Sequence, residues 1–576
     1  MSKKVLAVVL SLILVFSAFA VPVSAADITL PETSVENVFE MLIEKLLSFV
    51  LTYLNKYWPG YEDSWSDVEN YEAEYFFEGE EEFDREVAED AQWKVGYAGA
   101  SLLEGINPMD GDYYLAGSLE PIVGRVPTQV LDDQRVRVYA ISDGNSGIVV
   151  QAVIDGFGLS RGDVMEIRSR MAEFAEKYNI VAINVSVLHQ HSCIDTLGMN
   201  VPLAQALIMN TGNAAVGGLL DDQKVQKNQQ FMENLFTKTV YAMKRAVVNM
   251  KAGDLYYGAA DISDYIKDKR DPQTIDPEIQ RLRFVPEDGT TETWILEAAI
   301  HCTSIGAGPD ELTADYPYYI EKTIREEVGA NVVFIQGAEL AITSRDIVLC
   351  SECGEIADVT HADGVTISCP NGCVDAVTAA TIGDAADLWY ELHDYEGRTG
   401  IEDMKEYGYI LAKKVIAIEE EEKLDPVLNI KMQEVALTAD NGILTLAARE
   451  DVLNAIIVKD GEGYKLITEI GYMELGNKVA TFLCPGEFDP ILIFGGPASG
   501  DASWGKGEWE LPALADCTDC EYVMVYGLCN DQAGYVLRDN EYHSLLSENE
   551  EINVISKTSG STFVSNFMDI LAEVDA

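Results

Sequence analysis

Two histidines, His189 and His191, stand one residue apart in the stretch 180–195. The first part of this stretch is rich in valine and isoleucine, which predicts a buried strand. Residues i and i+2 of an extended chain point the same way, so both imidazoles are expected to face one site at the strand's carboxyl end. Neutral imidazole is the commonest metal ligand near neutral pH. An H-x-H pair alone more often marks two hydrogen-bonded histidines, so the metal hypothesis depends on the rest of the chain.

The histidine strand closes a strand–helix–strand unit, and a second such unit follows later. The first unit comprises a strand at 147–154 ending at Asp155, a helix at 164–178 and the histidine strand. The second comprises a strand at 291–300 ending at His301, a Gly-rich loop, a helix at 317–328 and a strand at 331–335. Two such units imply a sheet with covering helices, in which ligands collect beyond the carboxyl ends of the strands. His189, His191 and His301 all sit at such predicted strand ends.

The sequence therefore predicts an α/β fold with a mixed sheet, covering helices and a metal site at strand carboxyl ends. A β-rich C-terminal part is expected from Asn429 onward. The other predicted elements are strands at 135–142, 254–262, 478–483 and 521–527, and helices at 231–250 and 401–422.

Composition limits the classes of partner. The 576 residues carry a formal net charge of −57, from 97 acidic and 40 basic side chains. This balance argues against nucleic acid as a partner, because proteins bind its phosphates with a basic surface. It also disfavours electrostatic attachment to anionic lipid. A hydrophobic content of 48% supports a sizeable core. We interpret the acidity as a solvated surface.

The N-terminus has the pattern of a secretory signal. Lys3 and Lys4 precede an apolar run at 5–19, and small residues at 23–25 form a cleavage site before Ala26. We expect residues 1–25 to be a signal peptide, residues 26–92 to form a helix and an acidic arm or linker, and residues 93–576 to form the main domain. No later segment is long and apolar enough to span a membrane. The mature chain is therefore predicted to be secreted, or loosely associated with a surface.

Ten cysteines are present, and four of them lie in a predicted insertion at about 346–376. Cys350 and Cys353 form a C-x2-C pair, and Cys369 and Cys373 form a C-x3-C pair. This spacing is typical of a structural zinc knuckle or ribbon. Two disulfides are an equal alternative in an exported protein.

Four stretches in order resemble the neutral/alkaline ceramidase family of zinc amidohydrolases. They are LHQHS at 188–192, AIHCTS at 299–304, CPGEFDP at 484–490 and GLCNDQAGYVLRDNEY at 527–542. The family shows T-H-T-H-S-G-P, H-P/G-T-S, P-G-E-F-T-T, and G-L-x-N followed by a Tyr-rich motif. The likeness runs from about Trp93 to the C-terminus, and it omits the signal, the acidic arm and the Cys-rich insertion.

The resemblance implies a zinc site and a substrate. The matching metal ligands are His189, His301, Glu487 and Tyr535, and His191 matches a histidine beside the metal. Two imidazoles with oxygen ligands suit Zn²⁺ and leave room for a water, whose pKa zinc lowers to about 7. The implied reaction is hydrolysis of the amide of ceramide, and the implied partner is a lipid or small acylated substrate. Asp155 is either an orienting partner of a ligand imidazole or a solvated strand-end residue.

The chain also departs from the family. In the family the H-x-H is followed by S-G-P-G, whereas here Ser192 is followed by Cys-Ile-Asp. Gln532 stands in place of one tyrosine of the last motif. In the stretch GAELAITSR, Leu340 occupies the position of a serine implicated in catalysis, so Thr343 and Ser344 are the nearest candidate hydroxyls. Both could instead simply finish a loop or strand.

Three hypotheses remain open at this stage. The first is a secreted zinc-dependent amidase acting on ceramide or another N-acyl lipid. The second is a zinc hydrolase of a different amide or ester on the same scaffold. The third is a catalytically inactive protein that keeps the metal site for stability or binding. A phosphatase or nuclease is disfavoured, because the chain has no GxxxxGK[ST] loop and no clustered aspartates of a two-metal site.

Overall fold

The computed structural model describes residues 65–574 except for 111–112, 118–124, 199–228, 271, 307–308, 346–347, 349, 351, 354–356, 362–363, 381–384, 386–387, 390–391, 393–399, 450–451, 462, 498–507 and 544–550. The predicted signal peptide and the predicted helix within residues 26–60 lie outside the described residues.

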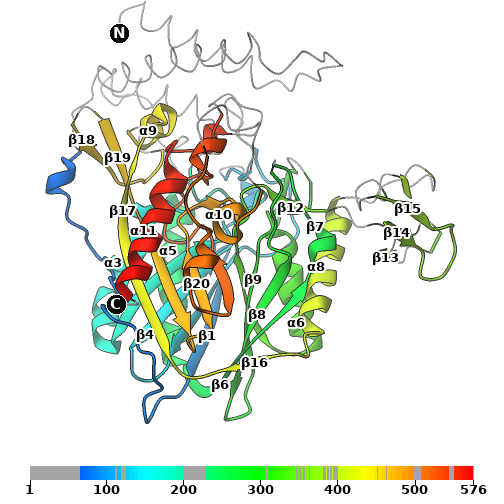
Figure 1. The fold of residues 1–576 in the computed structure, drawn as a ribbon, viewed down its shortest axis with the longest axis horizontal. Coiled ribbons are helices and arrows are strands. Elements are labelled where there is room, and N and C mark those ends of the chain that lie inside the picture. The colour runs from blue at the N-terminus through cyan, green and yellow to red at the C-terminus, as the bar shows by residue number, and fades with distance from the viewer. Residues whose placement is uncertain are drawn as a thin grey trace, which may run out of the picture.

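A nine-stranded mixed sheet forms the larger part of the fold (Figure 1). Its order is β11-β9-β8-β6-β1-β3-β4-β5, with β16 beside β6. The strands are β1 (Lys94–Ser101), β3 (Arg135–Ser142), β4 (Ile148–Ile154), β5 (Ile180–Val187), β6 (Lys251–Asp261), β8 (Glu278–Pro286), β9 (Thr293–Ala298), β11 (Asn331–Gln336) and β16 (Glu422–Leu424). The pairs β4–β5 and β9–β11 are parallel and the others are antiparallel, which confirms the predicted mixed sheet.

A five-stranded sheet makes up the β-rich C-terminal part, as predicted. Its order is β17-β19-β20-β22, with β18 beside β19. The strands are β17 (Leu428–Thr438), β18 (Ile457–Asp460), β19 (Gly463–Leu475), β20 (Val479–Leu483) and β22 (Tyr522–Tyr526). Here β20 and β22 are parallel, so their carboxyl ends also point the same way.

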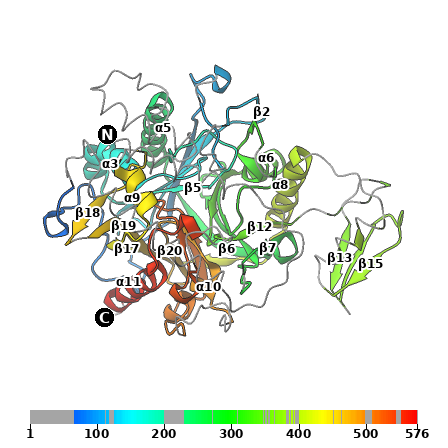
Figure 2. The same ribbon diagram turned by 90° about the horizontal axis from the view of Figure 1, so that it is seen from above.

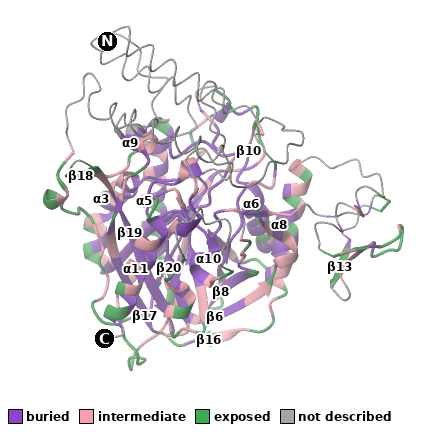
Figure 3. Ribbon diagram, turned by 45° about the horizontal axis from the view of Figure 1, so that its top comes forward, coloured by how far each residue is buried: buried purple, intermediate pink, exposed green. Residues whose placement is uncertain are grey.

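Alternation of side chains along β3 shows how the two sheets and the helices share the core. Val136, Val138 and Ala140 pack with α3 (Arg161–Tyr178) and α5 (Gln229–Val248). Tyr139 and Ile141 point to the opposite face and join the core beneath the second sheet. Figure 2 shows α3 and α5 on one side of the strands and α11 (Ser559–Val574) on the other. In Figure 3 the buried positions concentrate in the sheets between these helices.

Helices α6 (Asp315–Glu327) and α8 (Gly400–Ile416) pack against each other and against the β6–β11 half of the larger sheet. The sequence predicted that the second helix would run to residue 422, which is wrong. The guanidinium of Arg281 donates hydrogen bonds to the carbonyl of Ile418 and to the carboxylate of Glu421, just beyond the end of α8 at Ile416. Glu422 then begins β16. Tertiary contacts therefore override the local helical preference of this acidic run.

The larger sheet curls, so that its two ends meet. β11 stands at one end of the strand order, yet it contacts β3, β4 and β5 at the other end. The parallel pairs β4–β5 and β9–β11 thereby come together. The loops beyond their carboxyl ends then gather in one place, where ligands of such sheets collect.

The remaining elements are short. They are β2 (Gln129–Val130), β7 (Ile266–Asp268), β10 (Glu311–Leu312), β12 (Ile342–Ser344), β13 (Asp358–His361), β14 (Val365–Ser368), β15 (Val377–Ala379), β21 (Glu487–Phe488), β23 (Tyr535–Val536), α9 (Gly442–Arg449) and α10 (Pro490–Phe494), with 3-10 turns at 68–70, 108–110, 263–265, 514–517, 539–541 and 551–553. Strands β13–β15 form a small sheet of their own, set apart from the main body (Figure 1).

The described part of the acidic arm runs along the outer edge of β17. The N–H of Glu80 donates to the carbonyl of Ile430, and the N–H of Met432 donates to the carbonyl of Glu78. Phe83 is buried in the core with the C-terminal sheet. This segment is thus attached to the domain, with Glu78, Glu81 and Glu82 exposed and Glu80 half-buried against β17. Within the described residues, none of the helices has the length and apolar character needed to cross a membrane.

Candidate metal centre

Three side chains from distant parts of the chain meet at one point. Oε2 of Glu487 lies 3.4 Å from Nε2 of His189 and 3.2 Å from Nε2 of His301. All three residues are at least 95% buried. Within the described part of the chain, Oε2 of Glu487 has no hydrogen-bond partner. Two ring nitrogens and an unsatisfied carboxylate oxygen thus converge in a buried site.

Hydrogen bonds on the far side of each ring aim these nitrogens inward. Nδ1 of His189 lies 2.8 Å from the carbonyl of Phe157, and Nδ1 of His301 lies 2.8 Å from the carbonyl of Glu339. The Glu339 carboxylate also contacts Nδ1 of His301. In a neutral imidazole the nitrogen that faces a carbonyl is the protonated one, so Nε2 of each histidine, in its neutral form, carries the lone pair that a metal needs. Partners of this kind are usual for metal-binding histidines.

His189 follows the end of β5 in a conformation that the sequence did not predict. The strand ends at Val187, and His189 has a φ of 54°, in the left-handed region. The expectation of two histidines on one extended chain is therefore wrong, although their rings still lie close, with centroids 4.7 Å apart. A non-glycine residue in this region is strained by roughly 1–3 kcal/mol, and such strain concentrates at functional sites.

One buried amide ties the two histidine loops together. Nε2 of Gln336, the last residue of β11, donates to the carbonyl of Leu188 at 3.2 Å and also to the carbonyl of Ile300. These carbonyls immediately precede His189 and His301. The curl of the sheet brings the ends of β5, β9 and β11 within reach of this single side chain. Gln336 is therefore a positioning residue for both imidazoles.

Glu487 is brought in from the second sheet. The segment after β20 and the segment after β22 bond to each other, with Cys529 N–H donating to Cys484 and Leu528 N–H donating to Gly486. The second segment also lies along β5, where the side-chain oxygen of Asn530 accepts from Val185 N–H at 2.9 Å. Nε2 of Gln532 then donates to Oε1 of Glu487 at 2.9 Å. Gln532 therefore orients the carboxylate and leaves Oε2 directed at the histidines.

The electrostatic balance of the site favours a cation. Burial acts to lower the pKa of His301, but the carboxylates of Glu339 and Glu487 outweigh it and raise that pKa well above its usual value. Burial and the neighbouring imidazoles His191 and His301 hold the pKa of His189 well below its usual value. Two buried carboxylates thus share one site with rings that a metal could bind. A divalent cation would balance both negative charges, which buried charges require.

His191 adds a third ring to the site. Its Nδ1 lies 3.2 Å from the carbonyl of Gly117, and its Nε2 is buried without a hydrogen-bond partner among the described residues. A Cβ on Gly117 would lie 2.3–2.5 Å from atoms of His191, so only glycine fits there. Burial and His301 lower the pKa of His191 to about 3. His191 is therefore a neutral imidazole that offers a hydrogen-bond acceptor to the site.

The donor set fits zinc. The ligand atoms of His189, His301, Glu339 and Glu487 all lie within 4.8 Å of one another. Imidazole nitrogens and a carboxylate are common zinc ligands, and a catalytic Zn²⁺ keeps one further position open for water. Glu339 contacts Nδ1 of His301, so it serves better as the partner of a ligand than as a ligand. His189, His301 and Glu487 would then hold the ion.

Comparison with known proteins finds structural relatives only. No family model matches the sequence, and no curated protein matches it. The fold is similar to the crystal structure of neutral ceramidase from Pseudomonas aeruginosa, with a TM-score of 0.57 and 14% identity over 84% of this chain and 74% of that one. It is also similar to a ceramidase complexed with C2, with a TM-score of 0.55 and 13% identity over 84% of this chain and 76% of that one. These matches establish a ceramidase-like fold.

Tyr535 lies beside Glu487 in a short parallel ladder. β21 pairs with β23 so that Glu487 is directly opposite Tyr535 and Phe488 opposite Val536. Side chains that face each other across such a pair project to the same side of the sheet. The ring of Tyr535 is half-buried and packs against the apolar cluster of Leu340 and Leu537. Its predicted role as a ligand stays a prediction.

The two candidate hydroxyls lie on β12, the strand that follows Glu339. Thr343 is buried, and its hydroxyl has no hydrogen-bond partner in the described part of the chain, whereas Ser344 is half-buried at the strand end. Successive strand side chains point to opposite faces, so at most one of the two can face the site. Leu340 is buried with Leu537, Tyr542 and Val554, and it brings no hydroxyl to the position of the family's serine.

Among the described residues, the partners of Asp155 include no histidine ring and its side chain is fully buried, so neither the role of a ligand's partner nor a solvated strand end is correct. Its carboxylate pairs with Arg137 at 2.6 Å and accepts from Nε2 of Gln190 at 2.9 Å. Gln190 is the residue between the two histidines, so Asp155 braces their loop instead. Nδ1 of His189 instead donates to a backbone carbonyl two residues beyond Asp155, that of Phe157.

Glu339 and Gln336 are the site residues that the sequence did not single out. Glu339 had a usable signal, because it follows a predicted strand at 331–335 just as His189 and His301 follow theirs. Gln336 had none, since a glutamine at the end of a buried strand has no characteristic spacing. Only the curl of the sheet gives it two carbonyls to hold.

Proposed function

We propose that this chain is a secreted, zinc-dependent hydrolase that cleaves the amide of ceramide or of a related N-acyl lipid. The observation that carries the proposal is the convergence of His189, His301 and Glu487 in a ceramidase-like fold. Export is inferred from the N-terminal signal pattern.

The chain's own residues would divide the work of amide hydrolysis. His189, His301 and Glu487 would hold zinc, and Tyr535, opposite Glu487 in the ladder, is the proposed fourth ligand. Bound zinc supplies a water with a pKa near 7 and polarises the scissile carbonyl. Nε2 of His191 is a buried acceptor beside these residues, placed to take a proton and pass it to the departing amine.

The identity of the substrate rests on analogy with the relatives' names. The serine position of the family is Leu340, packed in an apolar cluster, so the chemistry here would need to proceed without that hydroxyl or with Thr343 in its place. This change specifically favours a second candidate, a zinc hydrolase of a shorter amide or an ester on the same scaffold. A panel of N-acyl and O-acyl substrates of increasing chain length separates the two.

The decisive experiment is release of fatty acid from a fluorescent ceramide by the purified, zinc-loaded mature chain. We expect hydrolysis that a chelator abolishes and that added zinc restores. The rate of His301→Ala should fall by about a hundredfold or more, because removing a metal ligand weakens zinc binding. His361→Ala, on β13 in the insertion, is the matched control and should keep the wild-type rate.

Two outcomes would overturn parts of the proposal. Hydrolysis that persists in His189→Ala and His301→Ala would show that these residues do not hold a catalytic metal. Bound zinc with no turnover of any acyl substrate would instead support the third hypothesis, in which the chain keeps the metal site without catalysis.

A further inference from the structure

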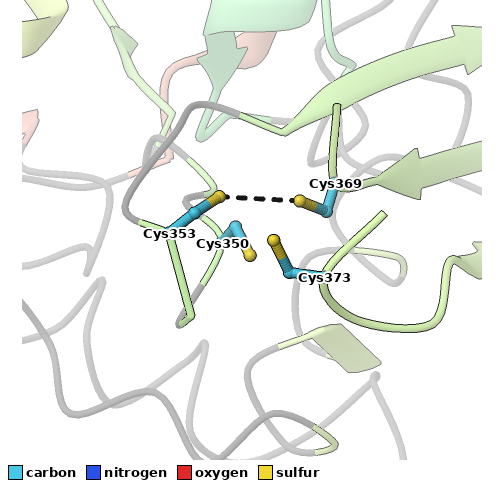
Figure 4. Close-up of side chains that lie close together, drawn as sticks. All are labelled: Cys350, Cys353, Cys369 and Cys373. Carbon is cyan, nitrogen blue, oxygen red and sulfur yellow. Dashed lines mark hydrogen bonds between the residues drawn. The ribbon is translucent and has the colours of Figure 1, made fainter. Parts of the chain in front are cut away.

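The Cys-rich insertion brings four thiols to one point, far from the histidine centre. The Sγ atoms of Cys350, Cys353, Cys369 and Cys373 all lie within 4.8 Å of one another. Figure 4 shows the four side chains converging from two loops. None of the four forms a disulfide. Each thiol faces the other three, so the arrangement is a cluster of four and not two separate pairs.

The spacing of the sulfurs matches a metal tetrahedron. Zinc–thiolate bonds are about 2.3 Å long, so the sulfurs of a tetrahedral site lie about 3.8 Å apart. Sγ of Cys353 and Sγ of Cys369 are 3.7 Å apart, and these two residues come from different loops. A disulfide would require a sulfur–sulfur distance of about 2.05 Å. The cross-loop distance thus fits a shared ligand.

Strand pairing explains why the two cysteine pairs meet. β13 and β14 form an antiparallel hairpin in which Asp358 pairs with Ser368. The first pair of cysteines precedes β13 and the second follows β14, so the closed hairpin places both pairs at the same end. A loop–hairpin–loop order with paired cysteines is the arrangement of a zinc ribbon.

Each loop also directs N–H groups at its first sulfur. Backbone hydrogen bonds from Glu352 and Cys353 reach the thiol of Cys350, and backbone hydrogen bonds from Asn371 and Cys373 reach the thiol of Cys369. The side chain of Asn371 additionally donates to Sγ of Cys353 at 3.6 Å. Donors of this kind favour thiolates and orient metal ligands.

The insertion has little else to hold it together. Among the described residues, its apolar core consists of nine buried residues, two of which are Cys350 and Cys369 themselves. The small sheet of β13, β14 and β15 has no strand in common with the two main sheets. Cores of this size rarely stabilise a fold alone, and small units commonly add disulfides or a structural metal.

We propose that Cys350, Cys353, Cys369 and Cys373 bind one zinc ion as a closed four-thiolate site that holds the insertion folded. All four coordination positions would be filled by sulfur, so this ion would be structural and take no part in hydrolysis. The proposal is independent of the histidine centre and of the hydrolase function.

The test is the zinc content of the full-length mature chain and three variants. The double variant C353S/C373S should contain one zinc ion per chain fewer than wild type, whether or not the histidine centre also binds zinc. These two thiols are the exposed members of the cluster, so the apolar core of the insertion keeps its packing. His301→Ala should retain the insertion's zinc, and C517S, outside the cluster, should keep the wild-type zinc content.

A second readout identifies the ligands directly. Cobalt-substituted wild type and His301→Ala should show thiolate-to-cobalt charge-transfer absorption, and C353S/C373S should lose it. Without reductant, all four cysteines should be alkylated after chelation but protected before it. Peptide mapping that finds disulfides among them, unchanged zinc content in C353S/C373S, or bound iron in place of zinc would overturn the proposal.

Discussion

Glu339 offers the sharpest test of how the histidine centre is tuned. The substitution is Glu339→Gln, which keeps the shape of a fully buried side chain and removes its negative charge. The Glu339 carboxylate contacts Nδ1 of His301, while Nε2 of the same ring faces Glu487. In the zinc form this carboxylate would increase the basicity of the ring nitrogen that binds the metal.

The expected loss of zinc affinity can be judged from other carboxylates that hydrogen-bond to metal-binding histidines. Loss of such a partner lowers metal affinity by about 10–100-fold, which corresponds to roughly 1.4–2.7 kcal/mol. Solvent cannot compensate, because the side chain of Glu339 is 0% exposed. The glutamine could still accept from Nδ1, so the site should weaken without being lost.

The assay is competition for zinc between the apo chain and a chromophoric chelator, in the C353S/C373S background so that a single site is titrated. Glu297→Gln is the matched control. Glu297 is also fully buried, and burial followed by the nearby Asp276 and Glu278 raises its pKa well above the usual value, which favours the uncharged carboxyl. It should bind zinc as wild type does. Wild-type affinity in Glu339→Gln, or equal losses in both variants, would refute the reasoning.

Three further predictions concern positioning and stability. Gln336→Leu removes the amide shared by the two histidine loops, and it should weaken zinc binding about tenfold and lower the free energy of unfolding by about 1–3 kcal/mol, measured by chelator competition and urea unfolding. Burial and then Glu278 raise the pKa of Asp276 to about 7, so the folded state holds its proton up to that pH while the unfolded state loses it near 4. This group should therefore make the free energy of unfolding fall between pH 4 and pH 7 by up to about 1.4 kcal/mol per pH unit. Asp276→Asn should remove that part of the pH dependence, and an unchanged pH dependence in the variant would contradict the assignment. Glu469→Gln removes the carboxylate that pairs with both Arg161 and Arg168. It should cost about 3–5 kcal/mol in thermal or urea unfolding, mainly through Arg168, because Arg161 keeps its ion pair with Glu434; a loss below about 1 kcal/mol would show that the Glu469 pairs are not structural.

Residue types at strand ends made most of the fold and part of the site predictable. The strand before His189, the strand before His301 and the intervening helices follow hydrophobic periods that packing preserves. Glu487 could be found because CPGEFDP follows a predicted strand and resembles a known motif. The predicted sheet is mixed as expected, and the β-rich C-terminal part forms its own sheet.

Other features depend on contacts that leave no mark in the local sequence. His189 has a positive φ because its loop is held by a carbonyl at Phe157 and an amide at Gln336, and neither partner has a characteristic spacing. Asp155 pairs with Arg137, from the neighbouring strand, and so is drawn away from the imidazoles. The end of α8 at Ile416 is likewise decided by Arg281 on a distant strand.

Anomalous diffraction at the zinc edge, from crystals of the zinc-loaded chain, would locate the ion in the histidine centre. We expect a peak about 2.0–2.2 Å from Nε2 of His189, Nε2 of His301 and a carboxylate oxygen of Glu487. This peak should vanish in His301→Ala crystals, while the peak among the four cysteines remains. Zinc-loaded crystals with no peak between these three side chains, or with the peak unchanged in His301→Ala, would contradict the assignment of a metal-dependent hydrolase.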